Sequence, residues 1–260
     1  MAESAIVARA IGLCGRDGRS FGCKMTAMPQ NAAPKSETNS ETRPERNVLV
    51  WDAATRLFHW LTAALVVAAY VTWRLDWMDW HARAGEAVLT LVIFRVLWGF
   101  FGSATARFAG FVASPRVALT HLAHLLRREP DRQVGHNPAG GWMVMLLLAL
   151  LLVETLSGLY INNDISDQGP LTELIPAPVA NAINAMHWIF WDALLAAIAL
   201  HLAAILIYAT AKRQNLVTPM ITGWKRLPEN VPQPRIASAL RACVLIGLSA
   251  LAVALLATAL

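Results

Sequence analysis

Four of the seven histidines lie within, or at the ends of, long apolar stretches of the sequence: His59, His81, His187 and His201. An ionisable residue inside a bilayer is costly, so each such residue is a candidate for a functional role. His187 and His201 are 14 positions apart in the sequence, and at about 100° per residue they differ by only about 40° around a helix. They therefore lie on nearly one helix face, roughly 21 Å apart along the axis. This spacing predicts one imidazole near each side of the hydrocarbon layer.

The expected direction of each helix pairs these histidines by depth. The first span enters from the cytoplasm, which places His59 in its inner half, and the second returns from outside, which places His81 at its outer end. By the same reasoning His187 is outer and His201 is inner. We therefore expect His59 to pair with His201, and His81 to pair with His187, each pair holding one metal centre between two helices of a bundle.

Two imidazoles at each depth favour haem b over an isolated metal ion. Haem iron needs only two axial ligands and an apolar slot, whereas zinc needs a third and a fourth ligand, and the sequence contains no HExxH motif. Two axial imidazoles leave no open coordination position, so the expected chemistry is electron transfer. None of the three cysteines is in a CxxCH motif, which predicts two non-covalent haems b per chain. The alternative is that single histidines act as polar contacts between helices.

Two further ionisable residues lie within the apolar stretches. Arg95 follows His81 by 14 positions, so it shares that helix face and reaches the depth of His201. There it could pair with the carboxylates of the inner haem, or it could extend its charge to the membrane surface. Glu154 lies roughly 10 Å from the outer end of its span. It could hydrogen-bond to a ligating imidazole, carry a proton, or be buried in the protonated form, and the sequence leaves these three roles open.

The composition is that of a membrane protein. Of the 260 residues, 56% are hydrophobic and 15% are charged, and the mean hydropathy is +0.46, whereas soluble domains carry about 25% charged residues. This balance excludes an ordinary cytosolic enzyme, a nucleic-acid-binding domain and a disordered regulator. Five segments have the roughly 20 apolar residues that a spanning helix needs. We predict an all-α membrane protein, a four-helix haem-binding bundle with a fifth C-terminal transmembrane helix, whose spans are Ala53–Trp73, His81–Phe101, Trp142–Ile161, Met186–Ala211 and Ala242–Leu260.

The loops predict the orientation and the domain limits. Lys and Arg are concentrated between the second and third spans and after the fourth, and the loop between the third and fourth spans has neither. Positively charged loops stay inside, so we expect a cytoplasmic N-terminus in a bacterial inner membrane, and the net charge of +5 does not indicate a nucleic-acid partner. Residues 1–46 are predicted to be a disordered tail, residues 47–226 the di-haem domain, and residues 227–260 a Pro-rich linker with the extra helix.

Five motifs, in chain order between about Val48 and Arg226, resemble those of the bacterial cytochrome b561 family, which includes the cytochrome b subunits of nickel–iron hydrogenases. They are VWDAATRLFHW at 50–60, HARAG at 81–85, FRVLWG at 94–99, GHNPAG at 135–140 and NLVTPMITGWK at 215–225. The resemblance implies a four-helix protein that binds two haems b through His59, His81, His187 and His201. It also implies electron transfer between membrane quinone and a redox partner protein, such as a c-type cytochrome or a hydrogenase. The N-terminal tail, the fifth helix and Glu154 depart from the family pattern.

Three functions follow from these patterns. The leading one is a di-haem electron-transfer subunit of a respiratory chain, with membrane lipid as its surroundings; whether it forms part of a quinone-linked oxidoreductase stays open. The second is a proton-coupled transporter that uses intramembrane His and Glu residues. Transporters commonly show repeated halves and broken helices, and neither is visible in the sequence. The third is a haem-free membrane scaffold. A low-spin haem spectrum of the purified chain would distinguish the first from the other two.

Overall fold

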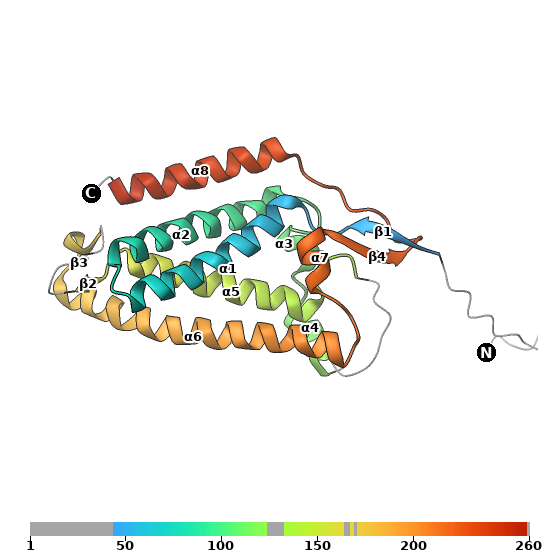
Figure 1. Ribbon diagram of the computed structural model, residues 1–260, viewed down its shortest axis with the longest axis horizontal. Helices are drawn as coiled ribbons and strands as arrows, with labels where there is room; N and C mark the ends of the chain where they lie inside the picture. Colours follow the sequence, from blue (N-terminus) through green and yellow to red (C-terminus); the bar gives the residue numbers. More distant parts are fainter. Residues whose placement is uncertain (1–43, 124–132, 164–166, 169–170, 259–260) are drawn as a thin grey trace, which may run out of the picture. The chain divides into compact units, whose positions relative to one another are not determined.

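The computed structural model describes residues 44–123, 133–163, 167–168 and 171–258. Within these residues, five helices are long and apolar enough to cross a membrane, as Figure 1 shows. This confirms the predicted all-α membrane class and the five predicted spans. The helices are α1 (Ala53–Arg74), α2 (Met78–Phe101), α5 (Pro138–Gly158), α6 (Ala177–Thr210) and α8 (Ala239–Thr258).

Side-chain caps define where two of these helices begin. The Asp52 carboxylate accepts a hydrogen bond from the backbone N–H of Thr55 at 2.6 Å, which satisfies one of the free donors at the start of α1. The Asn137 side chain does the same for Gly140 at 2.7 Å. Pro138 follows Asn137 in the first turn of α5, where a missing N–H costs nothing.

Helix α6 is longer than its apolar core. It has 34 residues and is therefore about 51 Å long, against a hydrocarbon thickness of about 30 Å. It begins at Ala177, after the N-cap residue Pro176, rather than at Met186 as the sequence predicted. Counting apolar residues identifies only the part of a helix that lies in the membrane. The helix itself can begin several residues earlier, where a proline favours its first turn.

The long helices pack around α2. Helix α1 packs along α2, α5 packs against both α2 and α6, and α8 lies along α2 as well. Val88, Val92, Leu151 and Leu194, from α2, α5 and α6, form one buried cluster. The fifth helix adds a second cluster, in which Val253 of α8 joins Leu89 of α2. The predicted fifth span is therefore packed on the second. Helix α2 is the most buried of the five, with 44% of its apolar window buried, compared with 11% for α1 and 11% for α8.

The remaining described elements are short. They are the helices α3 (Phe108–Phe111), α4 (Pro115–Ala123) and α7 (Val217–Thr222), the 3-10 turn η1 (Thr172–Leu174), and the strands β1 (Glu45–Leu49), β2 (Asn162–Asn163), β3 (Asp167–Gln168) and β4 (Trp224–Pro228). Strand β1 pairs with β4 and β2 pairs with β3, both antiparallel.

The β1–β4 pair joins segments that the sequence analysis assigned to different parts of the chain. Glu45 lies opposite Pro228, and Leu49 lies opposite Trp224. Glu45 and Arg46 thus form a strand at the end of the predicted tail, and residues 1–43 of that tail lie outside the described residues. Strands of five residues carry too little periodicity to be recognised in the sequence.

Candidate functional site

The inner pair of predicted ligands is brought together by α1 and α6. The ring centroids of His59 and His201 are 6.4 Å apart, and the ring planes are inclined by 54°. A metal ion ligated by two imidazoles separates their centroids by about 6.4 Å, because each metal–nitrogen bond is about 2.0 Å and each centroid lies about 1.2 Å behind its nitrogen. The two rings therefore have the spacing that one iron atom between them requires.

No larger cluster of metal ligands exists in the described part of the chain. There, no group of three or more His, Cys, Asp or Glu residues is placed to hold a metal ion. A zinc site built from protein ligands alone needs three or four of them. The described residues therefore suit a cofactor that brings its own equatorial ligands, as haem does.

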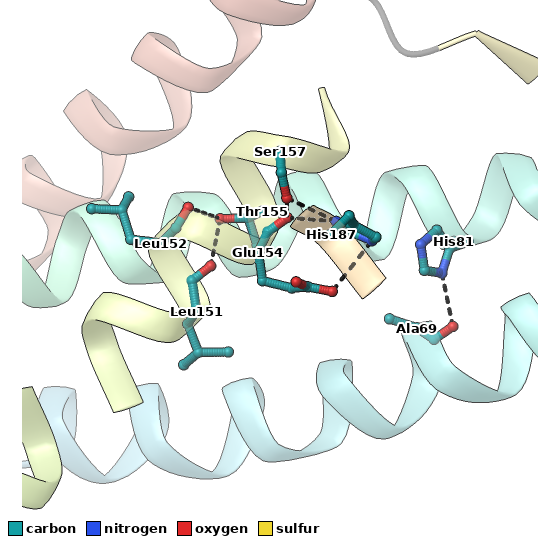
Figure 2. A network of polar contacts seen from close by, with 8 residues as sticks. All are labelled: Ala69, His81, Leu151, Leu152, Glu154, Thr155, Ser157 and His187. Carbon is teal, nitrogen blue, oxygen red and sulfur yellow. Dashed lines mark hydrogen bonds and ion pairs between the residues drawn. The ribbon is translucent and has the colours of Figure 1, made fainter. Parts of the chain in front are cut away.

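The outer pair of predicted ligands is oriented by hydrogen bonds at Nδ1 (Figure 2). His81 Nδ1 donates to the Ala69 carbonyl oxygen of α1 at 2.9 Å, and His187 Nδ1 donates to the Glu154 carbonyl oxygen of α5 at 3.1 Å. A carbonyl oxygen can only accept, so Nδ1 carries the hydrogen in both rings. Nε2 is then the nitrogen of each ring whose lone pair is available for a metal ion. His81 and His187 are also close enough to interact electrostatically.

Glu154 contacts the predicted ligand His187 directly. Its Oε1 lies 3.3 Å from Nε2 of His187, while its Oε2 is buried without a hydrogen-bond partner among the described residues. This contact corresponds to the first of the three roles that the sequence left open. Nε2 has one lone pair, so a metal ion bound there must displace the Glu154 carboxyl group.

Arg95 is enclosed at the inner end of α2. The residue is only 2% exposed, so its guanidinium does not extend to the membrane surface. Its Nη1 donates to the Ala106 carbonyl oxygen at 3.2 Å, and its Cζ lies 5.4 Å from the centre of the Phe108 ring. No carboxylate oxygen of the described residues lies within 4.0 Å of it. A buried cation without an ion-pair partner is costly, so this position suits an anionic group of a bound cofactor.

His136 interacts electrostatically with both His59 and His201, and it was not among the residues predicted from the sequence. Its ring lies between Trp51 and Phe111, with centroid distances of 4.6 and 4.8 Å. Burial is the largest cause, and the charges of Arg95, His201 and His59 act in the same direction, so that together they lower the pKa of His136 to about 3. His136 is therefore a neutral imidazole at physiological pH. Its only sequence signal was its place in the GHNPAG motif.

Ser157 is a second residue that the sequence analysis missed. It is buried on α5, and its Oγ lies 2.9 Å from Nδ1 of His187. Its position three residues after Glu154 places both residues on one helix face. A lone serine in an apolar helix gave no indication of this contact.

Comparisons with known proteins agree with this arrangement. The family model described as "Prokaryotic cytochrome b561" matches residues 50–223, more than half of the chain. The chain is 24% identical, over 76% of its length and 94% of the relative, to the "Probable Ni/Fe-hydrogenase B-type cytochrome subunit" of Bradyrhizobium diazoefficiens. A protein of the same description from Azotobacter chroococcum is 22% identical over 74% of this chain and 94% of the relative. No solved structure matches the chain significantly. The chain therefore belongs to the prokaryotic cytochrome b561 family, and it is a multi-pass bacterial membrane cytochrome b that acts in electron transfer.

Proposed function

We propose that the protein is a di-haem cytochrome that carries electrons between a redox partner protein and membrane quinone. The inner haem is held by His59 and His201, and the outer haem by His81 and His187. The observation that carries this proposal is the 6.4 Å spacing of the His59 and His201 rings, because two imidazoles that ligate one iron atom would have the same spacing. The Nδ1–H tautomers of His81 and His187 support the outer site.

The protein's part in this function is to hold and insulate the two haems. When bound, haem would supply one-electron chemistry, and ligation by two histidines would leave no position for oxygen to bind. Arg95 would hold the carboxylates of the inner haem in place of water. The apolar cluster of Val88, Val92 and Leu194 lies between the two depths and keeps this part of the bundle dry.

The partners follow from orientation and from the relatives. The N-terminus is cytoplasmic and the loop between α5 and α6 is external, because the basic residues lie at the other end of the bundle. The relatives' descriptions assign them to nickel–iron hydrogenases. By analogy, an external redox protein, such as a hydrogenase or a c-type cytochrome, docks at the outer haem of this chain, while quinone in the inner membrane lipid exchanges electrons at the other end. Residues 47–226 form the haem-binding unit, and residues 227–260 add α8 to its side.

Single histidine variants test the proposal. The purified chain is expected to contain two haems b, and potentiometric titration is expected to resolve two components. His59→Ala and His201→Ala each remove one of these components, and His81→Ala and His187→Ala each remove the other. His121→Ala is the control, because His121 lies on the short helix α4, outside the long helices that carry the two proposed pairs, and its Nε2 contacts the Tyr208 hydroxyl at 2.9 Å.

Three outcomes would contradict the proposal. The first is one haem per chain. The second is loss of the same component in the His59 and His81 variants, because those residues belong to different pairs. The third is a colourless protein from cells that supply haem.

A further inference from the structure

The imidazole of His187 is held on the side away from Nε2 by two groups of one α5 turn. Nδ1 lies 3.1 Å from the Glu154 carbonyl oxygen and 2.9 Å from the Ser157 hydroxyl. The Ser157 hydroxyl donates its own hydrogen to the Glu154 carbonyl at 2.9 Å. Its oxygen therefore accepts from Nδ1–H, and the two acceptors share one hydrogen. Figure 2 shows the three groups converging.

We infer that Ser157 is a positioning residue that orients His187 toward the outer haem and lowers the reduction potential of that haem. The inference rests on the proposed function, in which His187 is an axial ligand. An acceptor at Nδ1–H draws the hydrogen away from the ring and makes Nε2 a stronger electron donor. A stronger donor stabilises ferric iron over ferrous iron, and second-shell hydrogen bonding of this kind is one of the ways in which a protein tunes haem.

The surroundings of Ser157 make it suited to this role. The residue is 8% exposed, so its hydroxyl is largely shielded from water. Gly158, the next residue, lies against the same ring: a Cβ built there would be 3.5 Å from Cε1 of His187. The imidazole thus rests on the last turn of α5, and Ser157 supplies the side-chain hydroxyl that contacts it in that turn.

The inner pair has no equivalent group in the described part of the chain. His59 Nδ1 is buried there without a hydrogen-bond partner. The effect of Ser157 is therefore confined to one haem, which makes the inner haem an internal reference for every measurement on the outer one.

Ser157→Ala and Ser157→Cys test the inference. Alanine removes one of the two acceptors and leaves the Glu154 carbonyl oxygen, whereas cysteine keeps nearly the same volume but accepts hydrogen bonds only weakly. Both variants are expected to retain two haems and to raise the potential of the component that His187→Ala removes, with the smaller rise in the cysteine variant. The ferric low-spin electron paramagnetic resonance signal of that haem is expected to shift as well. The inner component is expected to keep its parental potential.

Thr155→Ala is the matched control. Thr155 lies two residues before Ser157 on α5, and its hydroxyl bonds only to the carbonyls of Leu151 and Leu152 in the same helix, at 2.8 and 3.2 Å. This variant loses a hydroxyl group from the same turn and is expected to leave both potentials unchanged.

The possible failures are distinguishable. Parental potentials in both Ser157 variants, a lowered outer potential, or equal shifts of the two haems would overturn the role of Ser157 while haem ligation by His187 stands. Retention of two haems by His187→Ala would overturn the proposed function itself. If the alanine variant does not assemble, the cysteine variant alone decides between these outcomes.

Discussion

Replacing Arg95 with leucine is expected to lower the potential of the inner haem and to leave the outer haem much less affected. The Arg95 side chain is buried and has no carboxylate within ion-pair distance among the described residues. The Asp52 carboxylate compensates part of the positive charge of Arg95 from a greater distance, and the remainder acts on its surroundings. A nearby cation opposes the additional positive charge of ferric iron, so removing the cation stabilises the ferric state and lowers the potential.

The positions of Arg95 and His136 allow the size of this effect to be estimated. The Arg95 Cζ and the His136 ring lie 6.0 and 4.8 Å from the same Phe111 ring centre, and His136 interacts electrostatically with both inner histidines. For an assumed separation of about 10 Å between the guanidinium and the iron, and an effective dielectric constant of about 20, a unit charge contributes about 1.7 kcal/mol. For a one-electron couple this corresponds to about 70 mV.

Potentiometric titration of the Arg95→Leu variant measures both haems in one experiment. The outer haem lies roughly 20 Å further along the membrane normal, so the same relation gives it less than half of the inner shift. Arg95→Lys is the control, since it preserves the charge and is expected to preserve most of the potential. Equal shifts of the two components, or no shift in either, would refute the placement of Arg95 at the inner haem.

Three further predictions concern the cofactor, the start of α1 and the inner site. Acid–acetone extraction is expected to remove all haem, and haem retained on the polypeptide would contradict the absence of a CxxCH motif. Asp52→Ala is expected to lower the free energy of unfolding by about 2 kcal/mol, as measured by thermal unfolding. The substitution removes the α1 cap, and it also removes the carboxylate that accepts a hydrogen bond from the Trp98 indole N–H at 3.2 Å in the parent. His136→Gln is expected to reduce the loss of stability at low pH. Between the pKa of about 6.5 in the unfolded chain and the pKa of about 3 in the folded protein, the unfolded chain binds a proton that the folded protein does not. In the parent, the free energy of unfolding therefore falls by at most about 1.4 kcal/mol for each pH unit, and denaturant unfolding at several pH values measures this slope. Equal pH slopes of the parent and the His136 variant would contradict this.

The spans and the histidine pairs could be predicted because both depend on regular repeats. Hydropathy over about 20 residues identifies a spanning helix, and 14 residues make almost four complete turns. These rules placed His59 opposite His201 without any knowledge of helix packing. The beginning of α6 at Ala177 could not be predicted in the same way, because the part of that helix before Met186 is less apolar and its start depends on Pro176.

The groups around each histidine could not be predicted, because they depend on how far each helix is rotated and on side-chain rotamers. Ser157 and Thr155 are two small hydroxyl residues on one helix turn, and the sequence does not distinguish them. In the fold Ser157 points at His187, whereas Thr155 bonds only to carbonyls of its own helix. A difference of two positions is about 200° around the helix, so a modest rotation of α5 would exchange their surroundings.

The two histidine pairs thus share a ligand type but differ in their surroundings. At the outer pair, carbonyl and hydroxyl acceptors contact Nδ1 of both rings, and the Glu154 carboxyl group lies beside Nε2 of His187. At the inner pair, His59 Nδ1 has no partner in the described residues, and buried Arg95 interacts electrostatically with His136, whose ring interacts with both inner histidines. Hydrogen-bond acceptors at the outer histidines would favour ferric iron and so lower the outer potential. A buried cation near the inner histidines would favour ferrous iron and so raise the inner potential, which means that both effects increase the difference between the two potentials. In the two-haem arrangement that we propose, the outer haem would then have the lower reduction potential of the two and would be the better electron donor.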